Sequence, residues 1–505
     1  MTVSRLIMAT IGAVALLSAA SCSAAGNGPA EITVEPAKTH QVMNGWEATA
    51  RLWEVNKAED RYDSSWLPLS DQIFDRLVNE LGINRIRMQI KSGAENPIDY
   101  WAKFESGAIG YKEFKRHYYE KINDDPDPKR VNQAGIQFSH VDYQVENIVL
   151  PLKRRLEAKG EKLFVNFNYV DFGQTELKGN LSHARQPAEY AELIHAAFVH
   201  LKSKYGLVPD ALEIILEPDN SDDWRGRQIG EAIRSVSARL KESGFSPEII
   251  APSTAAAGKA PAYIDEMMAV PGVPSLVSTL SYHRYDRPKP RTVTAIAKRA
   301  RALGVSNGLV DRLVPVPGIA ERARARRLST AMLEHLEGDA AELHEDLTVG
   351  QVSAWQQYSI AMKSVGRTPD EAGDYYYADF ADPNAPVIRI TKRSRGLAHY
   401  FRHVRLGAVR IEARSSDDAV KPTAFRNTDG TFVVVLASHE AGPMIVRGLP
   451  AGRYIASYTT AQENARELPP IVSDGTIAVS LPAAGIMTIR QETPAGIGTG
   501  VADPK

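Results

Sequence analysis

Residues 211–220, ALEIILEPDN, hold the pattern that decides the fold. The first six residues are apolar except for Glu213, as expected for a strand of a parallel sheet that is covered on both faces. Pro218 cannot donate to a strand ladder and ends the strand, and the two residues after it favour a turn. The stretch therefore predicts a buried strand with one carboxylate, that of Glu217, at its carboxyl end.

Strand patterns and helix patterns alternate on both sides of this stretch. Together with 211–217, the strand patterns are 41–49, 83–90, 162–168, 248–252, 276–283, 328–335 and 352–359. Most are separated by amphipathic helix patterns, at 67–81, 141–159, 187–205, 224–243, 262–268, 293–303 and 340–347. Alternating strands and helices imply a parallel sheet, and eight such units predict an α/β fold of the (β/α)8 TIM barrel type.

A second domain is expected, because 505 residues exceed the size at which one core stops growing. We assign 41–405 to the barrel, with 391–405 as its closing helix, and 406–492 to a β-sandwich of short strands. Asp429-Gly430 marks a hairpin there. Residues 23–40 form a tether and a strand, 31–37, that joins the sandwich at its edge, and the tail 493–505 is expected to be disordered.

The first 22 residues read as an export signal. Arg5 precedes the apolar run 6–17, and small residues lead to Cys22, the single cysteine of the chain. The segment resembles a bacterial lipoprotein signal in which Cys22 is lipidated, although Ala19 stands where leucine is usual; cleavage near Ala24 with ordinary secretion is the alternative. Either reading predicts a protein outside the cytoplasm, whose only membrane contact is a lipid anchor.

The composition excludes some partners. A net charge of −1 gives no argument for binding nucleic acid, and we expect a monomer that acts on a glycan. Neither a metal-ligand spacing nor a glycine-rich phosphate loop is present, so we expect no metal and no cofactor. His399 and His403 lie four apart, a spacing that we interpret as a solvated helix face.

Two acids stand at predicted strand ends, where a barrel of this type builds its active site. They are Glu217 on the fourth strand and Glu334 on the presumed seventh, 328–335. A pair of carboxyl groups is what glycoside hydrolysis requires, one to protonate the leaving oxygen and one to attack the anomeric carbon or activate water. For Glu334 the alternative is a salt bridge to the arginines of 306–327, which we interpret as an insertion on the opposite, stability face.

The layout is most similar to glycoside hydrolase family 30 of clan A, a barrel with a flanking β-sandwich. The resemblance covers about 31–491 and rests on Gly45-Trp46-Glu47-Ala48 on the first strand, the strand-end acids and the residues listed next. It implies a retaining enzyme with Glu217 as general acid/base and Glu334 as nucleophile. It further implies substrate-site roles for Trp46, Arg87 beneath the nucleophile, His283, Tyr285 and, as a sugar platform, Trp355.

The chain departs from this family at Leu216, where clan members carry the asparagine that binds the sugar's 2-hydroxyl. Asn168 or Asn220 would have to take over that contact, and the strand end around Asn168 is rich in hydrogen-bonding groups. Core positions are the alternative for His283 and Trp355. For the whole protein the alternatives are a non-catalytic surface glycan-binding protein on the same scaffold, and a transglycosylase that uses the same two acids.

Overall fold

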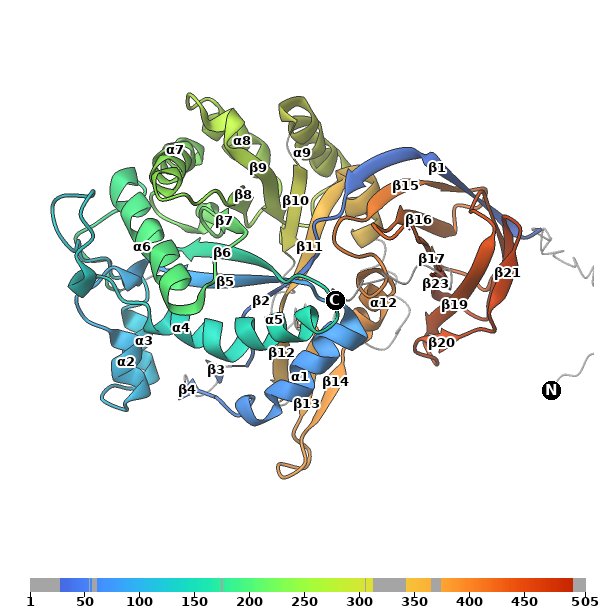
Figure 1. The fold of residues 1–505 in the computed structure, drawn as a ribbon, viewed down its shortest axis with the longest axis horizontal. Coiled ribbons are helices and arrows are strands. Elements are labelled where there is room, and N and C mark those ends of the chain that lie inside the picture. The colour runs from blue at the N-terminus through green and yellow to red at the C-terminus, as the bar shows by residue number, and fades with distance from the viewer. Residues whose placement is uncertain are drawn as a thin grey trace, which may run out of the picture.

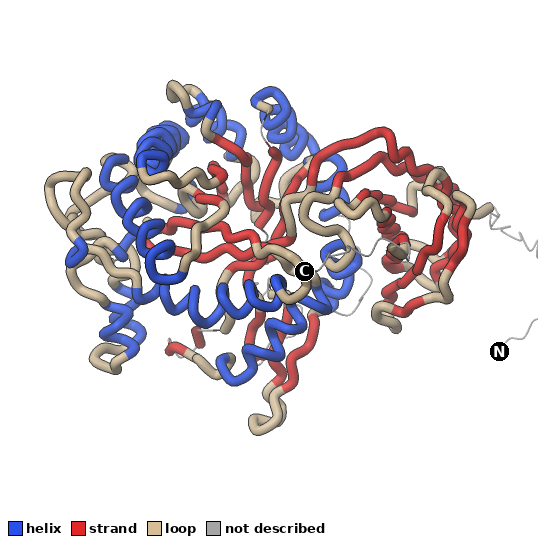
Figure 2. Tube along the Cα trace, viewed as in Figure 1, coloured by secondary structure: helices blue, strands red, loops and turns tan. Residues whose placement is uncertain are grey.

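The structure is a computed structural model and describes residues 28–53, 55–56, 61–173, 176–304, 306–311, 342–364 and 374–493. It consists of a helix-covered barrel and a strongly curved sheet that lies beside it (Figure 1). In the barrel the helices surround the strands, whereas the second part consists of strands and loops (Figure 2). The export signal, Cys22, Glu334 and the tail lie outside the described residues.

The eight strands of the barrel close in the order β10-β11-β2-β5-β6-β7-β8-β9, and all neighbours are parallel. The predicted TIM barrel is therefore confirmed. The strands are β2 (Trp46–Thr49), β5 (Arg85–Lys91), β6 (Phe164–Val170), β7 (Ala211–Glu213), β8 (Glu248–Thr254), β9 (Val277–His283), β10 (Ser306–Asp311) and β11 (Val352–Ser359).

The seventh strand of the barrel is not the predicted one. Strand β10 pairs with β9 on one side and with β11 on the other, so Ser306–Asp311 occupies the seventh position. The prediction that 328–335 forms the seventh strand is therefore wrong, and residues 306–311 belong to the barrel and not to an insertion on the stability face; residues 312–335 lie outside the described residues. The physical reason is ring closure, because only one segment can fill the gap between β9 and β11.

Helices cover the outside of the barrel close to their predicted positions. The helical segments between strands include η1 (Leu67–Leu69), α1 (Ser70–Arg76), η2 (Leu77–Leu81), α4 (Ser139–Gln144), η5 (Val145–Val149), α5 (Leu150–Glu157), α6 (Pro187–Tyr205), α7 (Gly226–Glu242), α8 (Ala260–Met268), α9 (Pro290–Leu303), η8 (Asp346–Gly350) and α12 (Lys392–Phe401). Among the described residues, none of the helices has the length and apolar character to span a bilayer.

Longer connections at the carboxyl ends of the strands add smaller elements. Between β5 and α4 lie α2 (Tyr100–Glu105) and α3 (Tyr111–Arg116), and their aromatic side chains form a separate cluster with Trp101 at its centre. A three-stranded sheet of β12 (Ala361–Ser364), β13 (Tyr376–Asp379) and β14 (Val387–Ile390) follows β11. A short hairpin of β3 (Val55–Asn56) and β4 (Arg61–Tyr62) follows β2.

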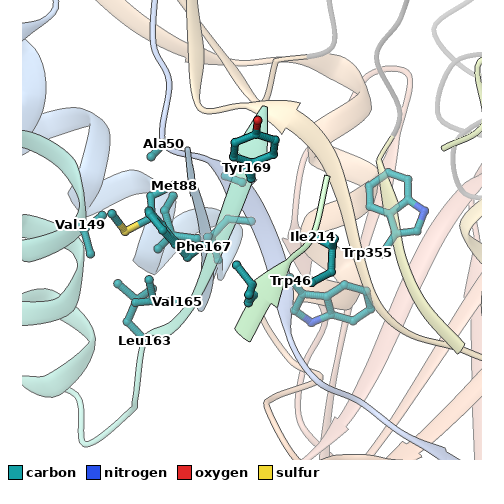
Figure 3. Packing of buried hydrophobic residues seen from close by; sticks show 14 of the residues in the cluster. Trp46, Ala50, Met88, Val149, Leu163, Val165, Phe167, Tyr169, Ile214 and Trp355 are labelled. Carbon is teal, nitrogen blue, oxygen red and sulfur yellow. The ribbon is translucent and has the colours of Figure 1, made fainter. Parts of the chain in front are cut away.

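Side chains of the barrel strands alternate between the helical layer and the barrel interior. On β5 and β6, Met88 and Phe167 lie opposite each other in register and pack against Val149 of η5 (Figure 3). Arg87 and Asn166, the preceding pair in the register, belong instead to a group of buried polar residues. The strands thus separate an apolar outer core from a polar interior, and the polar interior leads to the site.

The second part is one ten-stranded sheet that curves around its own core, the predicted β-sandwich. Its strands are β1 (Ala30–Val42), β15 (Val409–Ser415), β16 (Val420–Arg426), β17 (Phe432–Ser438), β18 (Gly442–Arg447), β19 (Gly452–Thr460), β20 (Arg466–Glu467), β21 (Ile471–Ser473), β22 (Thr476–Leu481) and β23 (Gly485–Gln491). The predicted hairpin joins β16 to β17, with Gly430 at φ +84°. Strand β1 lies inside the sheet, between β15 and β18, so its predicted edge position is wrong.

Helix α12 joins the two parts. Trp46 stacks on Phe401 of this helix with ring centroids 4.4 Å apart, and its indole N–H donates to the Val404 carbonyl. On the other side of the helix, His399 hydrogen-bonds to Thr459 and Thr488 of the sandwich. His399 is 4% exposed, so the predicted solvated histidine face is wrong at this position. Burial lowers the pKa of His399 to about 3, which keeps the imidazole neutral.

Candidate active site

Glu217 lies just beyond β7, the fourth strand, at the carboxyl end where active sites of such barrels form. Its backbone is left-handed, with φ 48° and ψ 61°, and its N–H donates to the carbonyl of Ser253 near the end of β8. A left-handed conformation costs a residue other than glycine about 1–3 kcal/mol, and such strain occurs mostly at functional sites. The following Pro218–Asn220 turn (η6) then fixes the direction in which the Glu217 side chain leaves the strand.

Three side chains donate hydrogen bonds to the Glu217 carboxylate. Asn220 Nδ2 lies 2.7 Å from Oε2, and His283 Nδ1 lies 3.1 Å from Oε1. Tyr285 supplies the third. Burial of the carboxyl group raises its pKa, but the hydrogen bonds and charge of His283, with those of Asn220 and Tyr285, outweigh burial and hold the pKa of Glu217 below its usual value. The side chain is 12% exposed, so an ionised carboxylate is presented at a small opening.

The predicted group of Glu217, Asn220, His283 and Tyr285 is therefore brought together. The resemblance gave His283 a substrate-site role; its contact here is with Glu217, and at 1% exposure it is also well packed. The geometry fixes its tautomer, because an ionised carboxylate only accepts hydrogen bonds and Nδ1 must carry the proton. Asn220 donates to the carboxylate and orients it, and its predicted contact with the substrate stays a prediction.

Asn168 stands near the end of β6 with one unused donor. Its Oδ1 accepts a 3.4 Å hydrogen bond from Gln89, and among the described residues its buried Nδ2 has no hydrogen-bond partner. Leu216 is 6% exposed, and its backbone N–H donates to the Tyr169 carbonyl at 2.9 Å. The third strand thus carries an unpaired amide donor near the strand end, where Leu216 offers none, but Asn168 is itself 0% exposed.

Arg87 is buried in the barrel interior below this level. Its Nη1 lies 3.8 Å from Glu213 Oε1, and its Nη2 donates to Thr49 Oγ1 at 3.0 Å. Asn166 Nδ2 donates to the other oxygen of Glu213 at 3.0 Å. Arg87 is fully buried, so it is placed to act on the charge of neighbouring carboxylates rather than to touch a sugar.

Trp355 and Trp46 do not line the site. Trp355 is 1% exposed and donates its indole N–H to Asp346 of η8 at 3.2 Å, on the helical side of β11. Trp46, its register partner, is fully buried against Phe401. Figure 3 shows both indoles beside the apolar packing of the barrel. The predictions of a sugar platform at Trp355 and a substrate contact at Trp46 are wrong, because both side chains point away from the barrel interior.

The seventh strand ends at Asp311, which lies in register with His283 on β9 and with Gln356 on β11. Its backbone is therefore next to the residue that contacts Glu217. Glu334 lies outside the described residues, so its predicted position as the partner of Glu217 stays a prediction. The strand that was expected to carry it is replaced by β10.

Three further residues lie at this end of the barrel and were missed by the sequence analysis. Arg51, just after β2, donates from Nη1 to the hydroxyl of Tyr358 on β11. Burial raises the pKa of Tyr119 well above its usual range, and the charges of Asp171 and Glu217 act in the same direction. The position of these residues near strand ends is the one sequence signal that could have indicated them. They are not acids, and the resemblance does not include them.

Comparison with known proteins gives one family match within the sandwich. Residues 407–447 match the model described as the glycosyl hydrolase family 30 beta sandwich domain. No curated protein matches the chain in sequence.

Solved structures extend the likeness over both parts of the molecule. The catalytic domain of the family 30 xylanase C from Talaromyces cellulolyticus is 15% identical, with a TM-score of 0.64 over 92% of this chain and 100% of that chain. The family 30 subfamily 8 xylanase Xyn30A from Clostridium acetobutylicum is 17% identical, with a TM-score of 0.61 over 92% and 100%.

The chain shares the fold of glycoside hydrolase family 30. The resemblance predicted from the sequence is thereby confirmed. An endo-β1,6-glucanase is similar as well, at 15% identity and a TM-score of 0.60 over 92% of this chain and 95% of that chain. The fold is therefore common to proteins described as acting on different glycans, so the side chains at the strand ends must decide the substrate.

Proposed function

We propose that this protein is a retaining glycoside hydrolase that cleaves O-glycosidic bonds of a glycan or polysaccharide. One observation carries the proposal: an ionised, strained and almost buried carboxylate, Glu217, stands at the fourth strand end and is held by three hydrogen-bond donors. The family 30 fold supports it, since its similar structures are described as xylanases and a glucanase. No observation on the described residues favours the non-catalytic alternative.

The reaction needs a second carboxyl group about 5–5.5 Å from Glu217. In the first step one carboxylate attacks the anomeric carbon while the other group protonates the departing oxygen, so the glycosidic C–O bond breaks and a glycosyl ester forms. In the second step the same acid/base group takes a proton from water, which attacks the anomeric carbon and releases the ester. The configuration is inverted twice and so retained.

Glu334 is our proposal for the nucleophile, on the strength of the resemblance, with Glu217 as acid/base. Asp311 is the second candidate, because the backbone register puts it at the seventh strand end beside His283. The lowered pKa keeps Glu217 ionised, which is the form that can accept a proton from water. Approach of a second ionised carboxylate would raise that pKa and let Glu217 act first as an acid.

The decisive experiment is product analysis on a panel of glycans with Glu217→Gln, Glu334→Gln and Asp311→Asn. NMR of the first-formed anomer should show retention for the wild type. Glu217→Gln should lose activity by at least about a thousandfold, and so should one of the two single variants Glu334→Gln and Asp311→Asn. Glu176→Gln is the matched control, because this carboxylate is 73% exposed and paired with Arg116.

An acid/base role for Glu217 makes a further specific prediction. In Glu217→Gly, added azide should restore turnover and yield a glycosyl azide of retained configuration, because azide attacks the glycosyl ester from the face that water would use. An azide product of inverted configuration would instead make Glu217 the nucleophile. Unchanged hydrolysis by Glu217→Gln, or glycan binding without hydrolysis by the wild type, would refute the enzyme proposal, and products extended by an added acceptor would indicate transglycosylation.

We also propose that the protein is exported and anchored through Cys22. The proposal rests on the sequence of residues 1–22. Expressed with its own signal, the wild type should distribute with membranes and carry acyl groups on Cys22 by mass spectrometry, whereas Cys22→Ala should lose both. A soluble wild-type product that begins near residue 25 would leave secretion without an anchor.

A further inference from the structure

Three carboxylates from distant parts of the chain meet beside the carboxyl end of the barrel. Glu95 follows β5 and the short turn η3 (Ser92–Ala94), Asp124 lies in the connection after α3, and Glu189 is in the first turn of α6. One oxygen of each lies within 4.8 Å of one oxygen of the other two. None of the three is part of the hydrogen-bonded group around Glu217.

These oxygens lack the partners that buried carboxylates normally have. Glu189 is 5% exposed, and its buried Oε2 has no hydrogen-bond partner among the described residues. Glu95 Oε1 and Asp124 Oδ1 are also buried without a hydrogen-bond partner among the described residues. An unpartnered buried carboxylate is costly, so a positive ligand at their meeting point would remove a large penalty.

A fourth carboxylate adds to the negative charge. Glu192, one turn further along α6, is fully buried, and neither of its oxygens accepts a hydrogen bond from the described residues. Among the described residues, Arg239 Nη2 pairs with Glu192 Oε1 at 3.7 Å. The second basic neighbour of the group is His183, whose Nε2 lies 2.7 Å from Glu95 Oε2.

The electrostatics of the group point the same way. Burial, together with the charge of Asp124, raises the pKa of Glu192 to about 9. Burial also raises the pKa values of Glu189 and Asp124, and the charge of Glu95 acts in the same direction on both. Such a group either keeps protons near neutral pH, shared for example between Glu189 and Glu192, or holds a cation.

We propose that Glu95, Asp124 and Glu189 bind a divalent cation of the Ca²⁺ type, with Glu192 as a neighbouring carboxylate that completes or orients the ligand set. All the donors are oxygens, which hard cations prefer and which make a zinc or copper site unsuitable. Ca²⁺–O distances of about 2.3–2.6 Å allow ligand oxygens on opposite sides of the ion to lie up to about 5 Å apart. The spacing of the three oxygens fits this limit.

A cation bound at this site would stabilise the connections at the carboxyl ends of the barrel strands and would take no part in the reaction. It ties the first turn of α6 to two points, Glu95 and Asp124, of the long connection between β5 and α4. His183 links Glu95 to the hydroxyl of Tyr169 on β6, with Nδ1 2.7 Å from that oxygen. Two residues further on, Asp171 accepts from Lys121, which lies in the same connection as Asp124. A bound cation would therefore hold the connections that surround the fourth-strand acid.

The test is metal binding by the full-length protein after treatment with a chelator. Calorimetric titration with CaCl₂ should show one site per chain, Tb³⁺ should give sensitised emission that Ca²⁺ displaces, and saturating Ca²⁺ should raise the unfolding midpoint by a few degrees. Glu189→Gln and Asp124→Asn should weaken Ca²⁺ binding at least tenfold and lose the rise. Asp125→Asn is the matched control, because this neighbour of Asp124 pairs with Arg130 instead.

Wild-type protein answers the question even if a variant fails to fold. Absence of Ca²⁺ binding by calorimetry and by Tb³⁺ emission would overturn the proposal, and so would equal binding by the wild type and Asp124→Asn. A gain in stability at pH 8 in Glu192→Gln or Glu189→Gln, with or without calcium, would show that the group holds protons instead. MgCl₂ serves as the comparison ion, and tighter binding of Mg²⁺ than of Ca²⁺ would overturn the assignment to Ca²⁺.

Discussion

His283 Nδ1 lies 3.1 Å from Glu217 Oε1, so the end of the sixth strand controls the charge of the fourth-strand acid. The imidazole is 1% exposed and its position is set by β9, which lies two strands away from β7 in the barrel. The ionisation of Glu217 therefore depends on the packing of the barrel as well as on its own loop.

Removal of this contact should move the pH profile. His283→Ala takes away the largest favourable influence on the carboxylate, so the pKa of Glu217 should rise and the limb of the kcat/KM profile that reports it should shift to higher pH. Tyr285→Phe should give a smaller shift in the same direction. His200→Ala is the control, because its partner Asp142 belongs to α4 on the outside of the barrel. An unmoved limb in His283→Ala would contradict the assignment.

Glu217 should also make stability depend on pH with a definite sign. Its pKa in the folded protein lies below its ordinary value of about 4.5, so its contribution to stability is present above that value and is lost as the pH falls through the lower, folded-state pKa. Below about pH 4.5, the unfolding midpoint of the wild type should therefore fall relative to that of Glu217→Gln. A difference that stays constant from pH 7 to pH 3 would show that the pKa is not lowered.

Removal of only one partner of the buried ion pair between Arg87 and Glu213 should destabilise the protein more than replacement of both. Glu213→Ala leaves a guanidinium buried in the barrel without this carboxylate and should destabilise the protein by about 3–5 kcal/mol. The double change Arg87→Met with Glu213→Leu should recover a large part of that loss, measured by denaturant unfolding. Glu176→Ala, which breaks an exposed pair with Arg116, should cost less than about 1 kcal/mol.

The variant Trp355→Phe tests whether Trp355 is a core residue or a sugar platform. The change removes the indole hydrogen bond to Asp346 and should cost about 1 kcal/mol of stability, with KM for the glycan unchanged. A large rise in KM with no loss of stability would restore the platform role.

Asn168 should contact the substrate's 2-hydroxyl if it replaces the missing asparagine of position 216. With a 2-deoxy substrate the wild type should lose activity, and Asn168→Ala should lose little more, because both changes remove the same hydrogen bond. Equal sensitivity of the wild type and Asn168→Ala to loss of the 2-hydroxyl would show that the contact is made elsewhere.

The sequence was sufficient to predict the barrel, the sandwich and the fourth-strand acid, because each rests on local pattern. Helix α6 and strand β11 match their predicted bounds, 187–205 and 352–359. The prediction of the seventh strand was wrong for the same reason, because it too rested on local pattern alone. Residues 328–335 repeat the apolar run with an acid at its end, whereas Ser306–Asp311 is short and contains a glycine. Only pairing with β9 and β11 distinguishes the two.

Side-chain direction and distant contacts were not readable from the sequence. A shift of one residue in register decides whether Trp355 or Gln356 faces the barrel interior, and the sequence does not fix that register. The meeting of Glu95, Asp124 and Glu189 depends on how the long connection between β5 and α4 folds onto the first turn of α6, so the spacing of these residues along the chain does not predict it.

Strand β1 makes the sandwich a discontinuous domain, with the whole barrel inserted between its first strand and the rest. Ile32 is in register with Ser415 on one side and Val446 on the other. During synthesis, the first strand to leave the ribosome must wait for partners that emerge almost 400 residues later, so the barrel has time to form before the sandwich can close. The sandwich is thus the last domain to be completed, and it holds both ends of the barrel segment. A cut between Val42 and Trp46 would separate β1 from the barrel and leave all the barrel strands in place.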